Sequence, residues 1–169
     1  MYPKACELGR VNFVVDESFI GNALNAIDAK NRLSVPASFR DVIATRSDTR
    51  AAILAPAERA DCLVGFDQGY PAKVKAELEA RFAGDFSDAR DDRFRATFGS
   101  AEKVPIDDNG RIILSTAMKD AGEIDRLALF WGMGDYFEIW NPHRFVERPG
   151  LDPRVVRMVR RLLDGRGEA

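Results

Sequence analysis

Histidine and cysteine are scarce in this chain, and their positions leave little room for a metal site. The only histidine is His143, and the two cysteines, Cys6 and Cys62, are isolated from it and from each other. Zinc sites and disulfide frameworks need such residues at short, paired spacings. We therefore expect no metal site, two reduced thiols, and a surface or helix-capping role for His143, which follows Pro142.

The sequence also lacks a long apolar run. Hydrophobic residues make up 46% of the 169 residues. No stretch approaches the roughly 20 apolar residues that a membrane-spanning helix needs. The first residues, MYPKACELGRVNF, lack the apolar segment of a secretory signal peptide. We expect one compact cytoplasmic domain with no membrane partner.

Residue patterns for catalysis are thin as well. Asp91 and Asp92 are adjacent in the sequence, as are Asp107 and Asp108, and neighbours on a strand point to opposite faces. Neither pair is therefore arranged as an acid–base dyad. The segment 132–134, Gly-Met-Gly, lacks the third glycine and the following helix of a dinucleotide-binding loop. We expect no enzyme, no cofactor and no small-molecule substrate, and a hydrolase or transferase ranks far behind other functions.

An excess of positive charge, the usual mark of a DNA-binding domain, is missing too. The 25 lysines and arginines are outnumbered by 27 acids, so the net charge is −2. Acids and arginines alternate between Arg81 and Arg95, which predicts a solvated connector between two halves. The part from His143 onward is locally basic, with Arg144, Arg148, Arg154, Arg157, Arg160, Arg161 and Arg166.

What the chain does contain is an internal duplication. Residues 25–40 are NAIDAKNRLSVPASFR and residues 105–119 are PIDDNGRIILSTAMK. This places Asp28 on Asp107 and Arg32 on Arg111 at a constant offset of 79. Each copy has an acidic residue, a three-residue turn, an arginine, an apolar strand and a short helix. Such a repeat predicts one fold built from two similar halves.

The first half is predicted to place strands and a turn around one helix. We expect a turn at 29–31 in which Asn31 accepts a positive φ, and Pro36 at the first helical position. The helix that follows would have Phe39, Val42 and Ile43 on one face. Val11–Ser18 is expected to be an edge strand or an arm. Further extended segments are expected at Phe19–Ile27, Arg32–Val35, Ala51–Ala55 and Cys62–Phe66.

The second half is predicted to repeat that order. Asn-Gly in the turn 108–110 favours a hairpin, and Ser115 is expected to cap a helix. Strands are expected at Lys103–Ile106, Arg111–Leu114, Leu127–Trp131 and Tyr136–Trp140, with core residues Trp131, Phe137, Ile139 and Trp140. Between the halves, Pro71–Ala83 is predicted to be a helix that stops at Gly84.

The C-terminal segment Asp152–Asp164, DPRVVRMVRRLLD, has the pattern of an amphipathic helix with an aspartate cap and proline at its first position. We favour docking of its apolar face on the body or on a neighbouring subunit, with the arginines solvated. Auxiliary contact with DNA or with a membrane surface is the less favoured alternative.

Together these motifs resemble the MraZ family of bacterial transcriptional regulators. The resemblance spans roughly residues 19–147 and rests on FIGNALNAIDAKNRLSVPASFR, GSAEKVPIDDNGRIILSTAMKDAG and the closing YFEIWNPHRF. It implies an α+β fold in which two pseudo-symmetric AbrB-like swapped-hairpin units form a small double-split barrel with helices outside. The chain departs from the family pattern at Asn31, where glycine is usual, and at Ser115, where proline is usual.

The resemblance also implies how the chain is divided. The two AbrB-like repeats are expected at 19–66 and 98–147, with a helix and connector at 71–95. The basic amphipathic helix expected at 150–166 lies outside the resemblance and rests on the residue pattern alone. All four parts are expected to form one folded domain.

The resemblance places the DNA contacts on the first turn, and the second turn is a weaker candidate. Arg32 and Lys30 are the expected main contacts, because an arginine can bond guanine edges bidentately while a lysine meets phosphate as a point charge. Asn31 either bonds a base or makes the turn. In the second turn Arg111 either braces the hairpin or contacts phosphate, with Asn109 beside it. The aspartates Asp28 and Asp107 are expected to brace their hairpins.

The function implied is a sequence-specific, DNA-binding transcriptional regulator in the cytoplasm and nucleoid. Its family resemblance implies promoter direct repeats and a cell-division and cell-wall gene cluster as the target. One chain offers few cations, so a ring-shaped homo-oligomer would be needed to present the turn repeatedly to double-stranded DNA. The alternative is a protein-interaction or scaffold module of AbrB-like fold that does not read DNA.

Overall fold

The computed structural model describes residues 17–167. The prediction for Cys6, and that for most of Val11–Ser18, therefore fall outside the described residues. Cys62 is a free, buried cysteine, as expected. Burial raises the pKa of its thiol to about 12.

The two halves have the same order of elements, which confirms a mixed α+β fold. The first half contains β1 (Asn22–Ala26), β2 (Arg32–Ser34), α1 (Ala37–Ser47), β3 (Ala51–Pro56) and β4 (Cys62–Phe66). The second contains β5 (Glu102–Pro105), β6 (Arg111–Ile113), α4 (Thr116–Ala121), β7 (Leu127–Gly132) and β8 (Phe137–Trp140).

Local details differ from the prediction at two positions. The strand expected from Phe19 begins only at Asn22, because Gly21 has φ 95° and Phe19 forms an isolated bridge with Gly134. Pro36 is the cap of α1 and not its first helical residue, since its ψ of 139° is extended. Ser115 caps α4 as predicted, with its hydroxyl accepting from the N–H of Met118.

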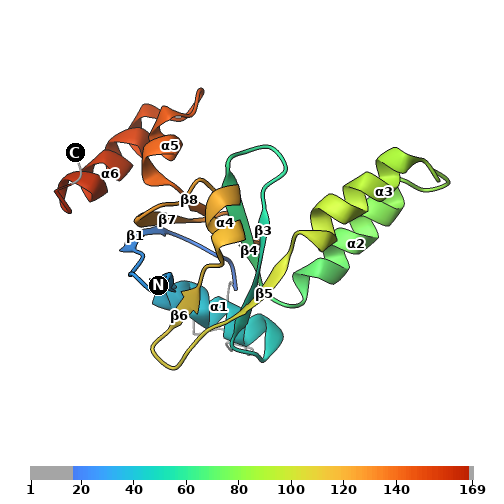
Figure 1. Ribbon diagram of the computed structural model, residues 1–169, viewed down its shortest axis with the longest axis horizontal. Coiled ribbons are helices and arrows are strands. Elements are labelled where there is room, and N and C mark those ends of the chain that lie inside the picture. Colours follow the sequence, from blue (N-terminus) through green and yellow to red (C-terminus); the bar gives the residue numbers. More distant parts are fainter. Residues whose placement is uncertain (1–16, 168–169) are drawn as a thin grey trace, which may run out of the picture.

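Strand pairing interleaves the two halves (Figure 1). Six antiparallel strands form a sheet in the order β1-β7-β8-β4-β3-β5, and β2 pairs with β6 in a separate ladder. The first strand of each half therefore pairs with the third strand of the other half, and the order is unchanged when the halves are exchanged. Neither half has a complete sheet of its own.

The main core lies between the sheet, the β2–β6 ladder and the helices α1 and α4. Its centre is a group of aromatic rings in which Phe19 lies 5.5 Å from Phe39 and 5.1 Å from Phe137. Phe137, Ile139 and Trp140 are buried as expected. Trp131 is only partly buried, and it packs beside Phe145 at the edge of a second cluster.

The second cluster lies on the outer face of the sheet under α5 (Pro142–Glu147) and α6 (Pro153–Asp164). Asp152 caps α6, while Val159 and Leu163 are buried against the sheet. The amphipathic C-terminal helix thus docks on the body, which was the favoured prediction. The Arg166 guanidinium extends this docking, because Nη2 donates to the Leu24 carbonyl at 2.6 Å.

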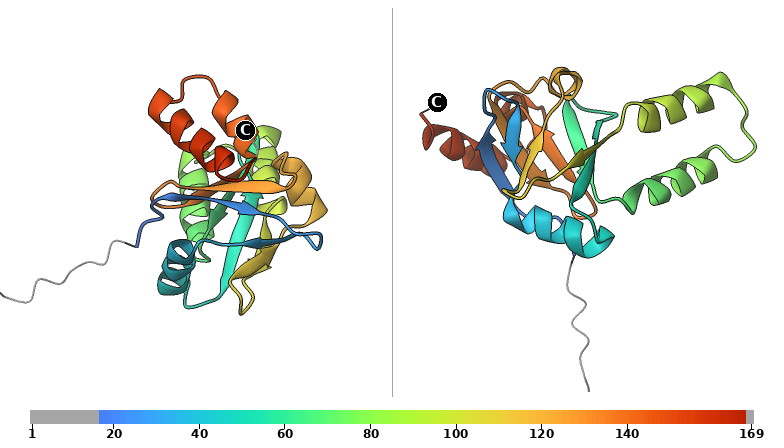
Figure 2. Two further views of the ribbon diagram at one scale, coloured as in Figure 1. Left: turned by 90° about the vertical axis from the view of Figure 1, so that its left-hand side faces the viewer. Right: turned by 60° about the horizontal axis from the view of Figure 1, so that its bottom comes forward.

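The segment between Arg81 and Arg95 is mostly exposed, as a solvated connector would be, but part of it is helical, which the sequence pattern did not indicate. After α2 (Tyr70–Arg81), residues 88–94 form α3 (Asp88–Phe94), followed by a π-helical turn, η1 (Arg95–Gly99). Ser87 caps α3, and acids in its first turn suit the positive end of the helix dipole. These elements form a two-helix arm that projects from the sheet, opposite α5 and α6 (Figures 1 and 2).

Candidate nucleic-acid interface

The first turn, residues 28–32 between β1 and β2, is closed by its own aspartate. Asp28 Oδ1 accepts from the backbone N–H of Lys30 (2.8 Å) and of Arg32 (3.0 Å), and Oδ2 accepts from Arg32 Nε at 2.6 Å. Asn31 is left-handed, with φ 58°, and its N–H bonds to the Asp28 carbonyl at 2.9 Å. The turn therefore has a fixed shape that leaves Lys30 exposed and the Arg32 side chain 34% exposed.

The second turn, residues 107–111 between β5 and β6, repeats the same bonds. Asp107 Oδ1 accepts from the N–H of Asn109 and of Arg111, both at 2.9 Å, and Oδ2 accepts from Arg111 Nε at 3.0 Å. Gly110 takes the left-handed position with φ 74°. The two turns are therefore equivalent in backbone and differ in the side chains they present.

Each turn is attached to the other half of the chain. The N–H of Val35 bonds to the Gly110 carbonyl, and the N–H of Leu114 bonds to the Asn31 carbonyl, both at 2.9 Å. Arg32 and Arg111 begin the two strands of the β2–β6 ladder, in which Arg32 faces Ile113. Because the ladder is antiparallel, the two turns lie at its opposite ends. The ladder is only three residues long, and both arginines lie on its exposed face, since Leu33 and Ile112 are buried on the other.

Two helix cations that the sequence analysis missed lie against these turns. Lys119 of α4 donates from Nζ to Asn31 Oδ1 at 3.2 Å, across the halves. Arg40 of α1 lies under Gly110, where an added Cβ would be 2.6 Å from Arg40 Cζ. The offset of 79 maps Arg40 onto Lys119 and Asn31 onto Gly110. Applied to the helices as well as to the turns, it would have identified both cations.

The turns differ in charge. The first turn has the cations Lys30 and Arg32 and is joined by Lys119. The second turn has Asp108 in place of Ala29, and this fully exposed carboxylate lies 3.3 Å from Arg50 Nη1. Acids also lie near the first turn, because Asp120, Glu123 and Asp125 line the same hollow as Asn31 and Lys119. The difference is therefore confined to the turns themselves, where only the first has a lysine.

The turn aspartates have lowered pKa values because their ionised carboxylates accept the hydrogen bonds of the turns. The backbone N–H of Arg32 is the main cause that lowers the pKa of Asp28 from 3.8 to about 2. The backbone N–H of Arg111 is the main cause that lowers the pKa of Asp107. Both carboxylates are therefore ionised at neutral pH and hold their arginines in place.

Comparison with known proteins adds independent information. The family model described as "MraZ protein, putative antitoxin-like" matches residues 97–147. A "Transcriptional regulator MraZ" from Gluconacetobacter diazotrophicus is 32% identical over 126 residues, which cover 73% of this chain and 78% of the relative. The chain belongs to the MraZ family. Relatives with the same name from Rickettsia akari (34% identical; 75% and 83% covered) and Azorhizobium caulinodans (31%; 87% and 92%) agree.

Membership of the MraZ family confirms the resemblance inferred from the two turn motifs. Relatives are matched over far more of the chain than the second half alone, so both halves belong to the common architecture. Among residues 17–167, no group of three or more histidine, cysteine or acidic side chains is placed to hold a metal ion. In the same residues, no helix has the length and apolar character needed to span a membrane.

Proposed function

We propose that this chain is a sequence-specific, DNA-binding transcriptional regulator whose first turn makes the main DNA contact. The relatives named above are transcriptional regulators by name. The observation that most supports DNA contact is the first turn itself, where Lys30 and Arg32 lie on a backbone fixed by Asp28, and Lys119 of α4 contacts Asn31. A rigid, cationic loop loses little conformational entropy when it binds.

Within the first turn, the arginine and the lysine have different roles. A guanidinium has five N–H donors, so the bond from Arg32 Nε to Asp28 leaves donors for guanine edges in the major groove. Lys30 is exposed and contacts phosphate. Asn31 mainly makes the turn, because its φ is positive and its Oδ1 already accepts from Lys119. Asp28 braces the hairpin and aims Arg32.

The second turn has a lesser role in the same proposal. Arg111 is held by Asp107 through Nε and Nη2, the latter at 2.9 Å from Oδ2. Its side chain is 29% exposed, so it either braces the hairpin or reaches a phosphate, and Asn109 is exposed beside it. The neighbouring Asp108 opposes close approach of DNA at this end of the ladder.

Several chains are needed to bind DNA tightly. Each neutralised phosphate contributes only a modest, salt-dependent gain in affinity. A ring-shaped homo-oligomer would present the first turn to successive direct repeats and so convert weak contacts into avidity. The proposed target is the promoter of a cell-division and cell-wall gene cluster, and the proposed location is the cytoplasm and nucleoid.

The interleaved strand pairing supports the finer description of the fold. We assign the halves 19–66 and 98–147 as AbrB-like swapped-hairpin units that together make a double-split barrel, with residues 71–95 as an insertion and 150–166 as an added helix. The support is that β1 pairs with β7 while β5 pairs with β3, which is an exchange of equivalent strands between the halves.

The test is fluorescence anisotropy with DNA from upstream of this protein's own gene, measured at several salt concentrations. Wild type should prefer this DNA to a scrambled duplex, and Arg32→Ala should lose that preference. Arg32→Lys should keep salt-sensitive binding but lose much of the sequence preference, because lysine cannot bond bidentately. Lys73→Ala, an exposed lysine on α2, is the matched control and should bind as wild type does.

The oligomeric size of every variant is checked by size-exclusion chromatography. A folded wild type with no preference for the upstream DNA would contradict the proposal. The scaffold alternative would then replace it, with both turns serving only to hold the hairpins.

A further inference from the structure

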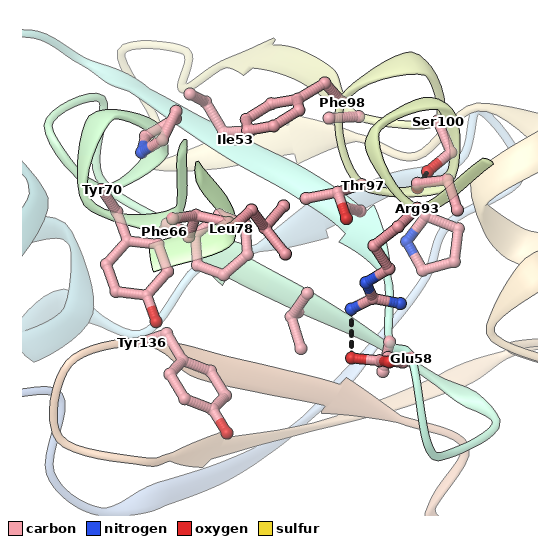
Figure 3. A pocket seen from close by; sticks show the side chains of 18 of the residues that line it. Ile53, Glu58, Phe66, Tyr70, Leu78, Arg93, Thr97, Phe98, Ser100 and Tyr136 are labelled. Carbon is pink, nitrogen blue, oxygen red and sulfur yellow. Dashed lines mark hydrogen bonds and ion pairs between the residues drawn. The ribbon is translucent and has the colours of Figure 1, made fainter. Parts of the chain in front are cut away.

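The outer face of the sheet is covered by helices at both ends, but only one end is closely packed. At one end, α5 and α6 bury Trp140, Phe145 and Val159. At the other, the two-helix arm leaves a cavity of about 670 Å³ between itself and strands β3 and β4 (Figure 3). Small-molecule sites usually have volumes of about 300–1,000 Å³, so this arm cavity has the size of a ligand site.

Most of the wall of the arm cavity is apolar and aromatic. Ile53 of β3 and Leu78 of α2 contribute to this wall (Figure 3). Val64 of β4 also lines the cavity. Phe66 stacks on Tyr70 with ring centroids 4.6 Å apart and an angle of 15°, and Tyr136 lies 6.2 Å from both rings. Burial raises the pKa of the Tyr70 and Tyr136 hydroxyls, so both rings are uncharged at neutral pH.

The polar part of the wall lies on the arm side, at Arg93 of α3. Its guanidinium is paired with Glu58, which follows β3. Arg93 Nε is buried and has no acceptor among the described residues. A buried donor without an acceptor is costly, roughly 1–3 kcal/mol. Because Nε is closed to solvent, the donors that can face the cavity are on the Nη atoms of this side chain, which is 24% exposed and is held by Glu58.

The charges in the wall balance. Arg81 and Arg93 are matched by Glu58 and Glu77. A polyanion such as DNA or a nucleoside triphosphate would gain little electrostatic attraction in this cavity. An uncharged molecule would leave the ion pair between Arg93 and Glu58 undisturbed. The cavity is also bounded by strands on one side and helices on the other, which suits a compact molecule better than an extended chain.

We propose that the arm cavity is a binding site for one uncharged, mainly aromatic small molecule with a hydrogen-bond acceptor. Arg93 donates to that acceptor, and the rings of Phe66, Tyr70 and Tyr136 contact the aromatic part of the ligand. Such a ligand contacts the sheet and both helices of the arm at once, so its binding fixes the arm on the sheet. The site is separate from both turns and does not depend on the proposed DNA contact.

The probe for this site is prodan, an uncharged naphthalene ketone whose emission shifts to the blue in an apolar environment. Full-length wild type should bind it saturably, one molecule per chain, and the anionic probe anilinonaphthalene sulfonate should bind no more tightly. Val64→Trp fills the cavity from β4, and its indole occupies the space that the ligand needs. Prodan binding should therefore weaken by about tenfold or more, which requires only a small loss of binding free energy. Met158→Trp adds the same ring at a residue on α6 that is 47% exposed and should leave binding unchanged.

Ala101→Phe fills the same cavity from the other side of the arm and serves as the second variant if Val64→Trp does not fold. Arg93→Met should weaken prodan binding severalfold, whereas Lys73→Met should not.

Three results would overturn the proposal: prodan binding at the wild-type level in both Val64→Trp and Ala101→Phe, no binding to wild type, or a stoichiometry of one probe per two chains. The last result would place the cavity at an interface between copies. DNA binding by the filled variants should stay at the wild-type level, so the two proposals fail independently.

Discussion

Lys119 and Asn31 come from different halves of the chain, and the Lys119 ammonium donates to the Asn31 amide oxygen at 3.2 Å. The equivalent pair in the other direction is Arg40 with Gly110. Each turn is therefore supported by a cation on the helix of the opposite half. A substitution on the helix of one half should therefore affect the turn of the other half.

Replacing Lys119 with methionine should weaken DNA binding without unfolding the protein. The variant keeps a long apolar stem but removes the positive charge beside the first turn. If the ammonium neutralises a phosphate, the slope of log affinity against log salt should become shallower by about one per engaged chain. Anisotropy titrations at several salt concentrations measure this slope. Lys73→Met is the control, and an unchanged slope in Lys119→Met would limit Lys119 to supporting Asn31.

Acid should loosen the first turn only at low pH. The pKa of Asp28 is lowered from 3.8 to about 2 in the folded protein, mainly by the Arg32 N–H. A lowered folded pKa contributes stability that is present above pH 3.8 and is lost as the pH falls through about 2. Carboxyl NMR should show Asp28 titrating near the lower value. Asp28→Asn should remove this part of the pH dependence of unfolding, and titration near 3.8 would contradict the hydrogen-bonded turn.

Adding one methyl group at Gly65 should destabilise the main core. Gly65 of β4 lies opposite Phe137 of β8, and a Cβ there would be 2.2 Å from the Phe137 ring. Because Phe137 is fully buried, the ring has no free space to enter. Gly65→Ala should therefore lower the free energy of unfolding by about 3 kcal/mol, measured by urea titration. Gly99→Ala, where nothing lies within 4 Å of the new Cβ, should be nearly neutral.

Truncation on the buried face of α6 should cost far more stability than truncation on its exposed face. Val159 is 0% exposed, whereas its neighbour Met158 is 47% exposed. Val159→Ala should lower the free energy of unfolding by about 2 kcal/mol, and Met158→Ala should change it little. Equal effects at the two residues would mean that α6 is not docked in solution.

The sequence was most informative where structure depends on nearby residues. The paired turns, the positive φ of Asn31, the Ser115 cap and the order of elements in both halves were all predicted and are present. The prediction for residues 88–94 was incomplete: alternating charge indicated an exposed connector, and most of these residues are exposed, but it did not indicate a helix. It gave too little weight to Ser87, which caps α3, and to Arg90, which lies 4.5 Å over the ring of Phe94.

Within the candidate site, the sequence alone identified Asp28, Arg32, Asp107 and Arg111, because each aspartate bonds to an arginine only four residues away. Turn geometry of this kind depends on local backbone chemistry. The sequence did not assign Lys119 or Arg40 to the turns, since each lies on a helix of the opposite half and reaches its turn only after the strands have exchanged.

The sequence by itself therefore determined that the chain has two equivalent halves, each with an aspartate-closed turn and an arginine behind it. Only the tertiary structure decided which strand pairs with which, that the two turns lie at opposite ends of the β2–β6 ladder, and that a cavity remains under the arm. The physical reason is how far apart in the sequence the interacting residues lie. Hydrogen bonds within five residues can be inferred from residue type and spacing, whereas pairing between strands of different halves depends on which apolar faces bury one another.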